Sequence, residues 1–435
     1  MTKVGIVSLG CPKNLVDSEQ MLGALAQAGC EIVSDKREAE VILINTCGFI
    51  ESAKEESLDT ILEMIRLKGA GACKSVIVAG CLAQRYADEL SREIPEVDAF
   101  VGVGQIAALP GIVQLTLDGH RVVDNSRPAR QWVEFEARIR ATPPWTAYLK
   151  ISDGCDNRCS YCAIPEIRGL FRSRPSDRIV AEAEILAAEG VKEIVLVGQD
   201  LTRYGSDTHE SLVSLLRRLA RVEGPTWIRL MYCYPTRISD DLIEVIASEP
   251  KIAKYIDVPL QHADDDVLRR MNRLGSSDEY LALLRRIRAA CPDMALRTSM
   301  IVGFPGETLE EFERLVDFVR EARFDRMGVF EYSREEGTPA ADIAPRIGAA
   351  TKRRRRDRLM REQQRVSLEM NKGFIGREID VLAERNDRGR SYRDAPDVDG
   401  VVLLNGFKGA PGEMVRARVT DATEYDLVAN VIDEV

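Results

Sequence analysis

The first 125 residues alternate short apolar runs with longer segments that place apolar residues at helical spacing. The short runs are rich in Val and Ile and are closed by Gly, Cys or Thr, which is typical of buried strands. These runs are Val4–Leu9, Val41–Asn45 and Ser75–Gly80, and the helical segments between them are Asp17–Gly29 and Glu51–Leu67. Strands that alternate with helices need crossover connections. We therefore expect an α/β domain with a doubly wound parallel sheet over residues 1–125.

The same alternation returns at residues 145–350, after a connecting segment at 126–144 that contains three prolines and no clear period. The predicted strands are Ala147–Ser152, Glu193–Val197, Trp227–Met231, Tyr255–Val258, Arg297–Val302 and Met327–Tyr332. The predicted helices between them are Asp177–Glu189, Glu210–Arg221, Asp240–Ala247, Asp278–Ala290 and Leu309–Ala322. Six strands with five intervening helices fit a partial (β/α)6 barrel better than an eight-fold one.

The pattern changes at residues 351–370, which form a connecting helix, and again at 371–435. Between Lys352 and Arg365 the helix holds eight basic and two acidic residues, which fits a solvated face, with a nucleic-acid contact as the alternative. Short alternating runs then predict a small antiparallel β-barrel, at Arg377–Ala383, Gly400–Leu404, Met414–Thr420 and Asp426–Val431. This module has nine basic and thirteen acidic residues, hence a net charge of −4, which suits a basic protein better than RNA.

The length and the hydrophobic content of the chain are sufficient for several domains, each with its own core. The chain has 435 residues, of which 45% are hydrophobic. No apolar run reaches the roughly 18 residues of a membrane helix, and the first apolar run is too short for a signal-peptide core. We expect a cytoplasmic protein with no membrane partner. The net charge of −10, from 60 basic and 70 acidic residues, argues against nucleic acid as a whole-surface partner.

The candidate chemistry lies in the cysteines, because the chain has ten Cys and only three His. Cys155, Cys159 and Cys162 form a CxxxCxxC motif directly after the first predicted barrel strand, at the mouth where such folds place active sites. Three thiolates at this spacing can hold one face of a cubane iron–sulfur cluster and leave one iron open. A structural zinc site would need four ligands, and no fourth Cys or His is near in the sequence.

A second set of cysteines falls at strand ends in the first domain. Cys11, Cys47 and Cys81 each lie at or just after the end of a predicted strand. The carboxyl ends of parallel strands line one crevice, so we expect these cysteines to converge and to hold a second three-cysteine cluster. The alternative is that they are small buried hydrophobic residues. Cys30, Cys73, Cys233 and Cys291 show no such pattern and are expected to be core or incidental residues.

The CxxxCxxC motif, with an aromatic residue before its last Cys, resembles that of the radical S-adenosylmethionine (SAM) superfamily. The resemblance implies a [4Fe–4S] cluster whose open iron binds SAM, with Tyr161 lining the adenine site. It also implies that Gly198, Gln199 and Asp200 contact the methionyl end of SAM. Gly303, in the segment Met300–Glu307, would lie near the adenosine, although this segment could equally be a tight strand-to-helix turn.

Two three-cysteine sets, a barrel and a terminal β-module together resemble the radical SAM methylthiotransferases, and the β-module resembles a TRAM domain. The segments Ser8–Asn14, Asn45–Phe49, Ser152–Cys155, Ala163–Gly169 and Ala395–Gly400 are similar to those of the branch that modifies ribosomal proteins. The tRNA-modifying branch typically has Gly-Cys-Gln-Met-Asn at the first cysteine, which this chain lacks.

The resemblance implies that a methylthio group is added to the β-carbon of an aspartate in the small-subunit ribosomal protein twelve, free or on the ribosome. It implies two [4Fe–4S] clusters, SAM, an electron donor and a sulfur donor. A tRNA adenosine methylthiotransferase is the nearest alternative, and the basic helix would be its best support. A non-enzymatic iron–sulfur carrier is the alternative from another class.

Overall fold

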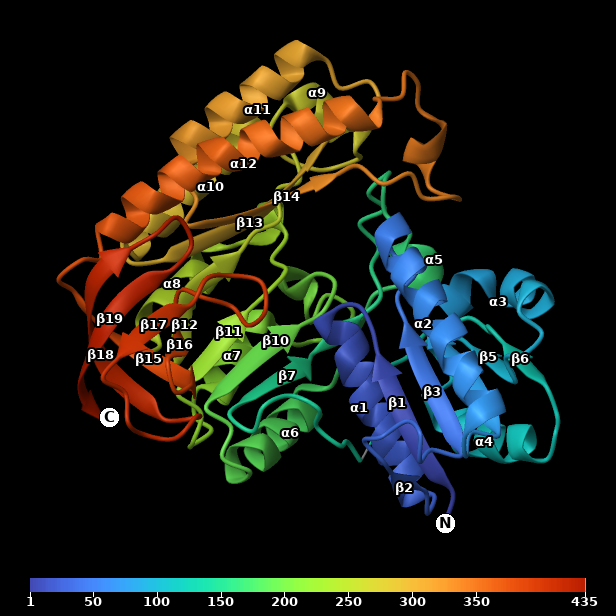
Figure 1. Ribbon diagram of the computed structural model, residues 1–435. Helices are drawn as coiled ribbons and strands as arrows, with labels where there is room; N and C mark the ends of the chain where they lie inside the picture. Colours follow the sequence, from blue (N-terminus) through green and yellow to red (C-terminus); the bar gives the residue numbers. More distant parts are fainter. Residues whose placement is uncertain (136, 435) are drawn as a thin grey trace. The chain divides into compact units, whose positions relative to one another are not determined.

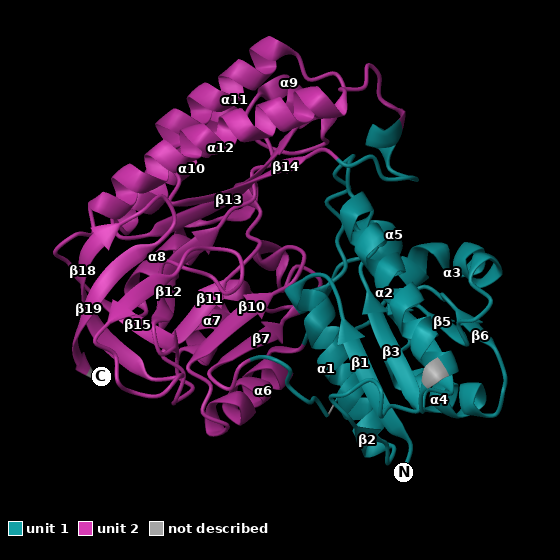
Figure 2. Ribbon diagram, viewed as in Figure 1, with its two compact units in different colours: residues 1–142, 152–174, 333–341 teal, residues 143–151, 175–332, 342–435 magenta. Residues whose placement is uncertain are grey.

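The computed structural model describes residues 1–135 and 137–434, so Glu136 of the predicted connection and Val435 of the predicted β-module lie outside it. The chain forms two compact units (Figure 2). Unit 1 comprises residues 1–142, 152–174 and 333–341, and unit 2 comprises residues 143–151, 175–332 and 342–435. Within the described residues, no helix is long and apolar enough to cross a membrane.

Unit 1 is built on a six-stranded parallel sheet in the order β2-β1-β3-β4-β5-β6 (Figure 1). Its strands are β1 (Lys3–Ser8), β2 (Glu31–Ile32), β3 (Val41–Thr46), β4 (Ser75–Gly80), β5 (Ala99–Val101) and β6 (Val122–Asp124). Every residue of β3 and β4 is buried, as expected for central strands covered on both faces.

Helices cover both faces of this sheet, which confirms the predicted doubly wound fold. Side chains of α1 (Pro12–Gln27) and α4 (Leu109–Leu117) pack in one hydrophobic core, and those of α2 (Glu51–Ala70) and α3 (Cys81–Glu93) pack in the other. The sheet order places β1, β3 and β4 side by side, so the segments that follow their carboxyl ends lie along one stretch of the sheet edge.

Unit 1 also contains two segments from later in the chain. The first is closed at its base by the antiparallel pair β8 (Ser152–Asp153) and β9 (Arg172–Ser173), and it includes the short helix α5 (Ile164–Arg168). The second is Ser333–Ala341, which includes all but the last residue of the 3-10 helix η4 (Pro339–Asp342).

Unit 2 contains a second six-stranded sheet, in the order β14-β13-β12-β11-β10-β7, in which all neighbours are parallel. Its strands are β7 (Thr146–Lys150), β10 (Glu193–Val197), β11 (Trp227–Leu230), β12 (Ile252–Asp257), β13 (Ala295–Val302) and β14 (Arg326–Glu331). Its helices are α6 (Ser176–Ala188), α7 (Leu212–Leu219), α8 (Asp240–Ser248), α9 (Asp265–Arg270), α10 (Ser277–Ala290) and α11 (Leu309–Ala322). The predicted six-stranded partial barrel is confirmed, with α9 as an additional short helix.

The chain ends in a closed five-stranded barrel, drawn in red in Figure 1, with the order β15-β16-β17-β19-β18. The strands are β15 (Glu378–Arg385), β16 (Arg388–Ser391), β17 (Val402–Asn405), β18 (Met414–Ala422) and β19 (Leu427–Glu434). The predicted small antiparallel β-barrel is confirmed, with one pair that differs, because β17 and β19 run parallel. These two strands are neighbours in the barrel but not consecutive in the chain, since β18 lies between them in sequence and pairs with β19 on its other side.

Five strands of two to four residues lie outside the predicted runs, namely β2, β5, β6, β9 and β16, and β8 overlaps a predicted run only at Ser152. Runs this short show no readable alternation, and β16 (Arg-Gly-Arg-Ser) has no apolar side chain at all. β2 and β6 lie at the margins of the first sheet and β5 lies beside one, whereas β9 pairs with β8 and β16 lies within the closed barrel. Backbone pairing with a neighbour, not an alternating pattern, defines each of them.

The basic helix α12 (Ala349–Lys372) packs on α11 and β14, and many of its cations are paired within unit 2. The pairs join Lys352 to the carbonyl of Tyr332, Arg355 to Glu307, Arg356 to Glu331 and Arg358 to Glu313. These contacts favour the interpretation of α12 as a connecting helix over that of a nucleic-acid contact.

A buried ion network joins the terminal barrel to the parallel sheet of unit 2. Glu193, the first residue of β10, accepts hydrogen bonds from Arg229 Nε at 2.7 Å and from Arg390 Nη2 at 2.5 Å. Burial opposes ionisation of Glu193, but the two guanidinium groups outweigh it and hold the pKa of this carboxyl below its ordinary value. Arg390 belongs to β16, so this carboxylate fixes the barrel against the sheet.

Further buried hydrogen bonds and ion pairs join the barrel to residues at or beside strands β12, β13 and β14 of the sheet. On the barrel side they involve residues that lie between β16 and β17. Arg326, the first residue of β14, donates to Asp394 at 2.6 Å, and Arg393 donates to Asp325 at 2.7 Å. Asp399 accepts from the Tyr255 hydroxyl at 2.7 Å and pairs with Arg297 at 3.3 Å. The segment Ala395–Gly400, which resembles the family in sequence, therefore takes part in the contact between the terminal barrel and the sheet.

We predict that Glu193→Gln lowers the free energy of unfolding of unit 2 by about 3–5 kcal/mol, because two buried guanidinium groups lose their carboxylate. Urea denaturation followed by the fluorescence of Trp145 and Trp227 measures this change. The matched control is Glu384→Gln, since Glu384 pairs with the same Arg390 at 2.8 Å but is partly exposed, and it should cost no more than about 1 kcal/mol. Equal losses in the two variants would contradict the assignment.

Candidate metal centre

Cys11, Cys47 and Cys81 lie on three segments that follow neighbouring strands of unit 1. Cys11 precedes α1 as its N-cap residue, Cys47 directly follows β3, and Cys81 directly follows β4 as the first residue of α3. The three thiols are close enough to influence each other's ionisation. The structure thus brings together the cysteines that the strand-end argument grouped, despite spacings of 36 and 34 residues.

Each of these cysteines has a glycine beside it, and each glycine is required by the close approach of two segments. A Cβ atom on Gly10 would lie 2.8 Å from Cys47 Cβ, and one on Gly48 would lie 2.7 Å from Leu82 Cα. Gly80 has φ +95°, and a Cβ there would overlap Asn45 Oδ1. The pairs Gly10–Cys11, Cys47–Gly48 and Gly80–Cys81 are readable in the sequence and mark this crowding.

Two polar side chains hold the cysteine segments in place. Asn14 Nδ2 donates to the carbonyls of Leu9, at 2.7 Å, and Thr46, at 3.3 Å, so one amide joins the segments that carry Cys11 and Cys47. Ser57 Oγ accepts from the backbone N–H of Cys47 at 3.1 Å and donates to its carbonyl at 2.9 Å. These bonds fix the backbone on either side of Cys47.

Cys155, Cys159 and Cys162 lie on the segment that β8 and β9 close, also in unit 1. The backbone N–H of Cys155 donates to Gly169 O at 3.1 Å, and that of Cys162 donates to Cys159 O at 3.0 Å. Gly154, just before Cys155, has φ +74°, and a Cβ there would overlap the Leu170 carbonyl. The segment therefore folds back on itself and places three thiols within eight residues.

Arg168 connects this second segment to the first cysteine set. Its Nη1 donates to Asp153 Oδ1 at 3.3 Å, two residues before Cys155. Its Nη2 donates to Asp17 Oδ2 at 2.8 Å and to Cys81 Sγ at 3.8 Å. Arg168 lies in a segment that resembles the family, but its role was not predicted, because nothing local in the sequence links it to partners 151 and 87 residues away.

Apolar residues in and next to α5 also hold the CxxxCxxC segment against the segment that carries Cys81. Ala163, the neighbour of Cys162, and Ile167 pack with Cys81 and Val103 in a small hydrophobic cluster. Because Cys81 belongs to this cluster, the two cysteine segments pack directly on each other through side chains. Both three-cysteine sets therefore lie within unit 1.

The segment Ser333–Ala341 contacts both cysteine segments through ion pairs and a backbone hydrogen bond. Glu335, which is 2% exposed, pairs with Arg85 at 2.8 Å and with Lys54 at 3.4 Å, and Arg85 also donates to Gly48 O at 2.7 Å. The N–H of Ala340 donates to Ser160 O at 2.8 Å, inside the CxxxCxxC motif. No pattern in the sequence indicated that this segment belongs to unit 1.

The local charges give the first three thiols different acidities. Burial raises the pKa of Cys81 to about 12, and the charge of Arg168 reduces this effect only in part. Burial also raises the pKa of Cys47. For Cys11, burial is outweighed by the charges of Lys13 and Arg168 and by backbone N–H groups, so its pKa lies below the ordinary value.

The donor set fits the group that the sequence analysis expects. Iron–sulfur clusters are held by cysteine thiolates, and each set offers three on a backbone that glycines and hydrogen bonds hold in place. The remaining cysteines are arranged differently. Cys73, Cys233 and Cys291 are buried in hydrophobic cores, and Cys30 packs against another.

The residues expected to contact SAM lie on both units. Tyr161 is half-buried in the CxxxCxxC segment of unit 1. Gly198, Gln199 and Asp200 follow β10 in unit 2, at the carboxyl end of the strand. Both amide atoms of Gln199 are buried without a hydrogen-bond partner in the described structure, which leaves them available to a ligand. The Asp200 carboxylate already accepts from Arg237 at 2.7 Å.

Gly303 follows β13 and has φ +72°, with the Lys352 side chain against the position of a Cβ. Glu307 Oε2 accepts from the N–H groups of Gly303, at 2.5 Å, and Phe304, at 3.0 Å. Burial raises the pKa of Glu307 to about 7, although Arg355 and these N–H groups act in the opposite direction. The contacts support the alternative that this segment is a tight strand-to-helix turn.

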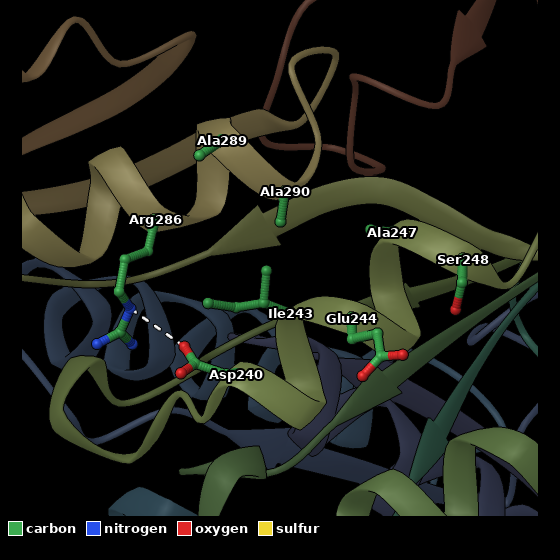
Figure 3. A pocket seen from close by; sticks show the side chains of 8 residues that line it. All are labelled: Asp240, Ile243, Glu244, Ala247, Ser248, Arg286, Ala289 and Ala290. Carbon is green, nitrogen blue, oxygen red and sulfur yellow. Dashed lines mark ion pairs between the residues drawn. The ribbon is translucent and has the colours of Figure 1, made fainter.

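Unit 2 also contains a surface hollow and a group of three carboxylates, and neither belongs to the cysteine sites. A hollow of about 630 Å³ lies between α8 and α10, where Arg286 pairs with Asp240 at 3.2 Å in a solvent-exposed position (Figure 3). The carboxylates of Asp264, Asp266 and Glu311 approach one another within 4.8 Å. Asp264 and Glu311 serve as helix caps, and all three pair with arginines.

Comparisons with known families assign each part of the chain. Residues 3–102 match the family described as "Uncharacterized protein family UPF0004", residues 149–319 match the radical SAM superfamily, and residues 375–432 match the TRAM domain.

Several curated proteins are similar over nearly the whole chain. The chain is 49% identical to "Ribosomal protein uS12 methylthiotransferase RimO" of Pelotomaculum thermopropionicum over 440 residues, covering 99% of both chains. It is 50% identical to the protein of the same name from Anaeromyxobacter sp., covering 99% of this chain and 93% of that one. For the Geobacter sulfurreducens protein of this name the identity is 48%, with 99% and 98% covered.

Solved structures show the same fold at much lower identity. The radical S-adenosylmethionine methyltransferase TsrM of Kitasatospora setae, with tryptophan and a SAM analogue bound, has a TM-score of 0.58 at 15% identity, covering 93% of this chain and 80% of that one. The cobalamin-dependent S-adenosylmethionine radical enzyme OxsB has a TM-score of 0.53 at 13% identity, covering 84% and 56%.

We predict that alkylation of the metal-free, reduced protein separates Cys11 from Cys81 by pH profile, because the thiolate is the nucleophile. Between pH 7 and 10 the rate at Cys81 should rise about tenfold per pH unit throughout, whereas the rate at Cys11 should level off first. Peptide mapping by mass spectrometry after short exposure to iodoacetamide measures both rates. Cys30, whose pKa burial raises, is the internal control and should still be rising where Cys11 levels off. Parallel profiles for Cys11 and Cys81 would contradict the assigned charges.

Proposed function

The chain belongs to the ribosomal protein uS12 methylthiotransferase (RimO) family of radical SAM enzymes, and we propose that it adds a methylthio group to the β-carbon of an aspartate of uS12. The observation that carries this proposal is the 48–50% identity to proteins of that name over 99% of the chain. A substrate made in the cytoplasm, and acted on free or on the ribosome, would place the reaction there.

The two cysteine sets are proposed to hold two [4Fe–4S] clusters with different roles. Cys155, Cys159 and Cys162 would hold the cluster that binds SAM, and Cys11, Cys47 and Cys81 would hold the second. When bound, the first cluster and SAM would supply a radical that removes the hydrogen atom of a C–H bond, the second cluster would hold the sulfur that replaces it, and a second SAM would supply the methyl group. An electron donor and a sulfur donor are then required as further partners.

The chain's own residues position these groups. Asn14 and Ser57 hold the backbone around Cys11 and Cys47, and the contacts of Ala340 and Gly169 hold the CxxxCxxC segment. Gln199 offers an amide with two unused polar atoms beside Gly198, at the strand end proposed for the methionyl part of SAM. Tyr161 is proposed for the adenine side, and Gly303 and Asp200 would act mainly through the shape of their turns.

We further propose the division into domains 1–125, 145–350 and 371–435, joined by 126–144 and the helix 351–370. The three family matches fall inside these three ranges. The terminal module, with a net charge of −4, suits a basic substrate protein. The ion pairs of α12 also weaken the best argument for a tRNA substrate, since fewer of its cations are free to contact phosphate.

We predict that Cys155→Ala abolishes SAM cleavage and product formation together, whereas Cys47→Ala retains SAM cleavage and loses sulfur insertion. The reason is that the first change removes a ligand of the SAM-binding cluster and the second a ligand of the other cluster. The measurement is anaerobic incubation of reconstituted full-length enzyme with uS12, SAM and reductant. Deoxyadenosine is then quantified by chromatography and the methylthio addition by mass spectrometry.

Cys30→Ala is the matched control, because Cys30 lies in the same unit outside both sets and should retain both activities. Methylthiolated uS12 from the Cys47→Ala enzyme would contradict the role of the second set. Modification of tRNA adenosine, with none of uS12, would contradict the substrate.

A further inference from the structure

Arg168 is a buried cation, 1% exposed, that touches a thiol of the first cysteine set and a carboxylate beside the second. We propose that Arg168 is a positioning residue that donates an N–H···S hydrogen bond to Cys81 and, balanced by Asp17, sets the reduction potential of the cluster held by Cys11, Cys47 and Cys81. This inference rests on the proposed function, which supplies that cluster.

The geometry supports a hydrogen bond to sulfur from a fixed donor. Nη2 lies 3.8 Å from Cys81 Sγ and 2.8 Å from Asp17 Oδ2, while Nη1 lies 3.3 Å from Asp153 Oδ1. A guanidinium is planar, so carboxylates on both of its terminal nitrogens restrict its rotation. The direction of the N–H groups toward Cys81 is therefore set before any cluster binds.

The backbone that carries Arg168 is fixed as well. Its own carbonyl accepts from Arg172 Nη1 at 2.8 Å, and Arg172 Nη2 also reaches Asp153, at 3.2 Å. One residue earlier, Ile167 packs in the hydrophobic cluster that contains Cys81. Movement of the guanidinium away from the sulfur would thus break an ion pair and open an apolar contact.

Charge and burial determine the expected direction of the effect. Reduction adds an electron to a cluster, and a hydrogen bond to its sulfur or a positive charge nearby stabilises the more negative form. Low local dielectric strengthens this interaction relative to water. Asp17 acts in the opposite direction because its negative charge partly cancels that of Arg168.

The test uses the full chain with Cys155, Cys159 and Cys162 all replaced by Ala, so that only the cluster on Cys11, Cys47 and Cys81 can form. The midpoint potential of this cluster is measured by anaerobic redox titration followed by electron paramagnetic resonance. Arg168→Gln in this background should make reduction at least tenfold less favourable, a shift of about 59 mV to more negative potential for one electron.

A second variant should shift the potential the other way. Asp17→Asn keeps the size and an acceptor oxygen but removes the counter-charge, so the midpoint should become more positive. Arg121→Gln is the control, since Arg121 is a cation of the same unit whose hydrogen bonds go to the carbonyls of Ser91, Ile94 and Val97, outside both cysteine sets and away from Arg168. It should change the reduction equilibrium less than twofold.

An unchanged midpoint in Arg168→Gln, with iron content retained, would overturn the inference. If Arg168→Gln does not fold or does not retain iron, Asp17→Asn decides, and the absence of a positive shift there overturns it. Failure of the parent variant to bind any cluster is a separate result, because it removes the second cluster from the proposed function itself. A missing shift in a protein that does hold the cluster affects only the role of Arg168.

Discussion

The close approach of three backbone segments at one edge of a parallel sheet determines where sulfur can be placed in unit 1. Strands β1, β3 and β4 are neighbours, and a cysteine follows each of them within three residues. The segments approach so closely that Gly10, Gly48 and Gly80 cannot carry a side chain without overlap or severe crowding. Thiols on such segments have little freedom to move, which suits ligands that must hold a bulky inorganic group on one side and leave the other side open.

The same crowding leaves polar groups that need partners, and a few side chains satisfy several of them at once. Asn14 bonds to carbonyls on two segments, and Ser57 bonds to both sides of the Cys47 peptide unit. Glu335 and Arg85 extend the network to the segment Ser333–Ala341. Because each of these side chains is shared between segments, the cysteine positions are coupled, and a change at one should be felt at the others.

The sequence allowed the strands and the grouping of cysteines to be predicted, because both depend on local patterns. Val41–Asn45 and Ser75–Gly80 read as buried strands from composition alone, and a cysteine at the end of each follows from counting. The resemblance included Arg168 in the segment Ala163–Gly169, but its role could not be predicted, since its partners Asp17 and Cys81 are distant in the chain and the contact depends on how α5 packs. The parallel pair of β17 and β19 was missed for a similar reason, because these strands are not consecutive in the chain and no local pattern shows that they become neighbours in the barrel. Ser333–Ala341 shows neither period nor motif.

Buried arginine–carboxylate pairs have the same structural effect in the two units. Glu193 with Arg229 and Arg390 in unit 2, and Arg168 with Asp17 and Asp153 in unit 1, all give up hydration on burial, and apolar residues of equal volume could stabilise the fold as well or better. What apolar contacts do not provide is a single allowed register, because they tolerate sliding and repacking. A guanidinium between fixed carboxylates has one good position. In unit 2 that position seats the terminal barrel on the sheet, and in unit 1 it aims a cation at a cysteine sulfur. Desolvation of these ions therefore opposes folding, but the ion pairs fix a single geometry. They do so at the seat of the terminal barrel and beside the cysteines, where the proposed chemistry depends most on exact positions.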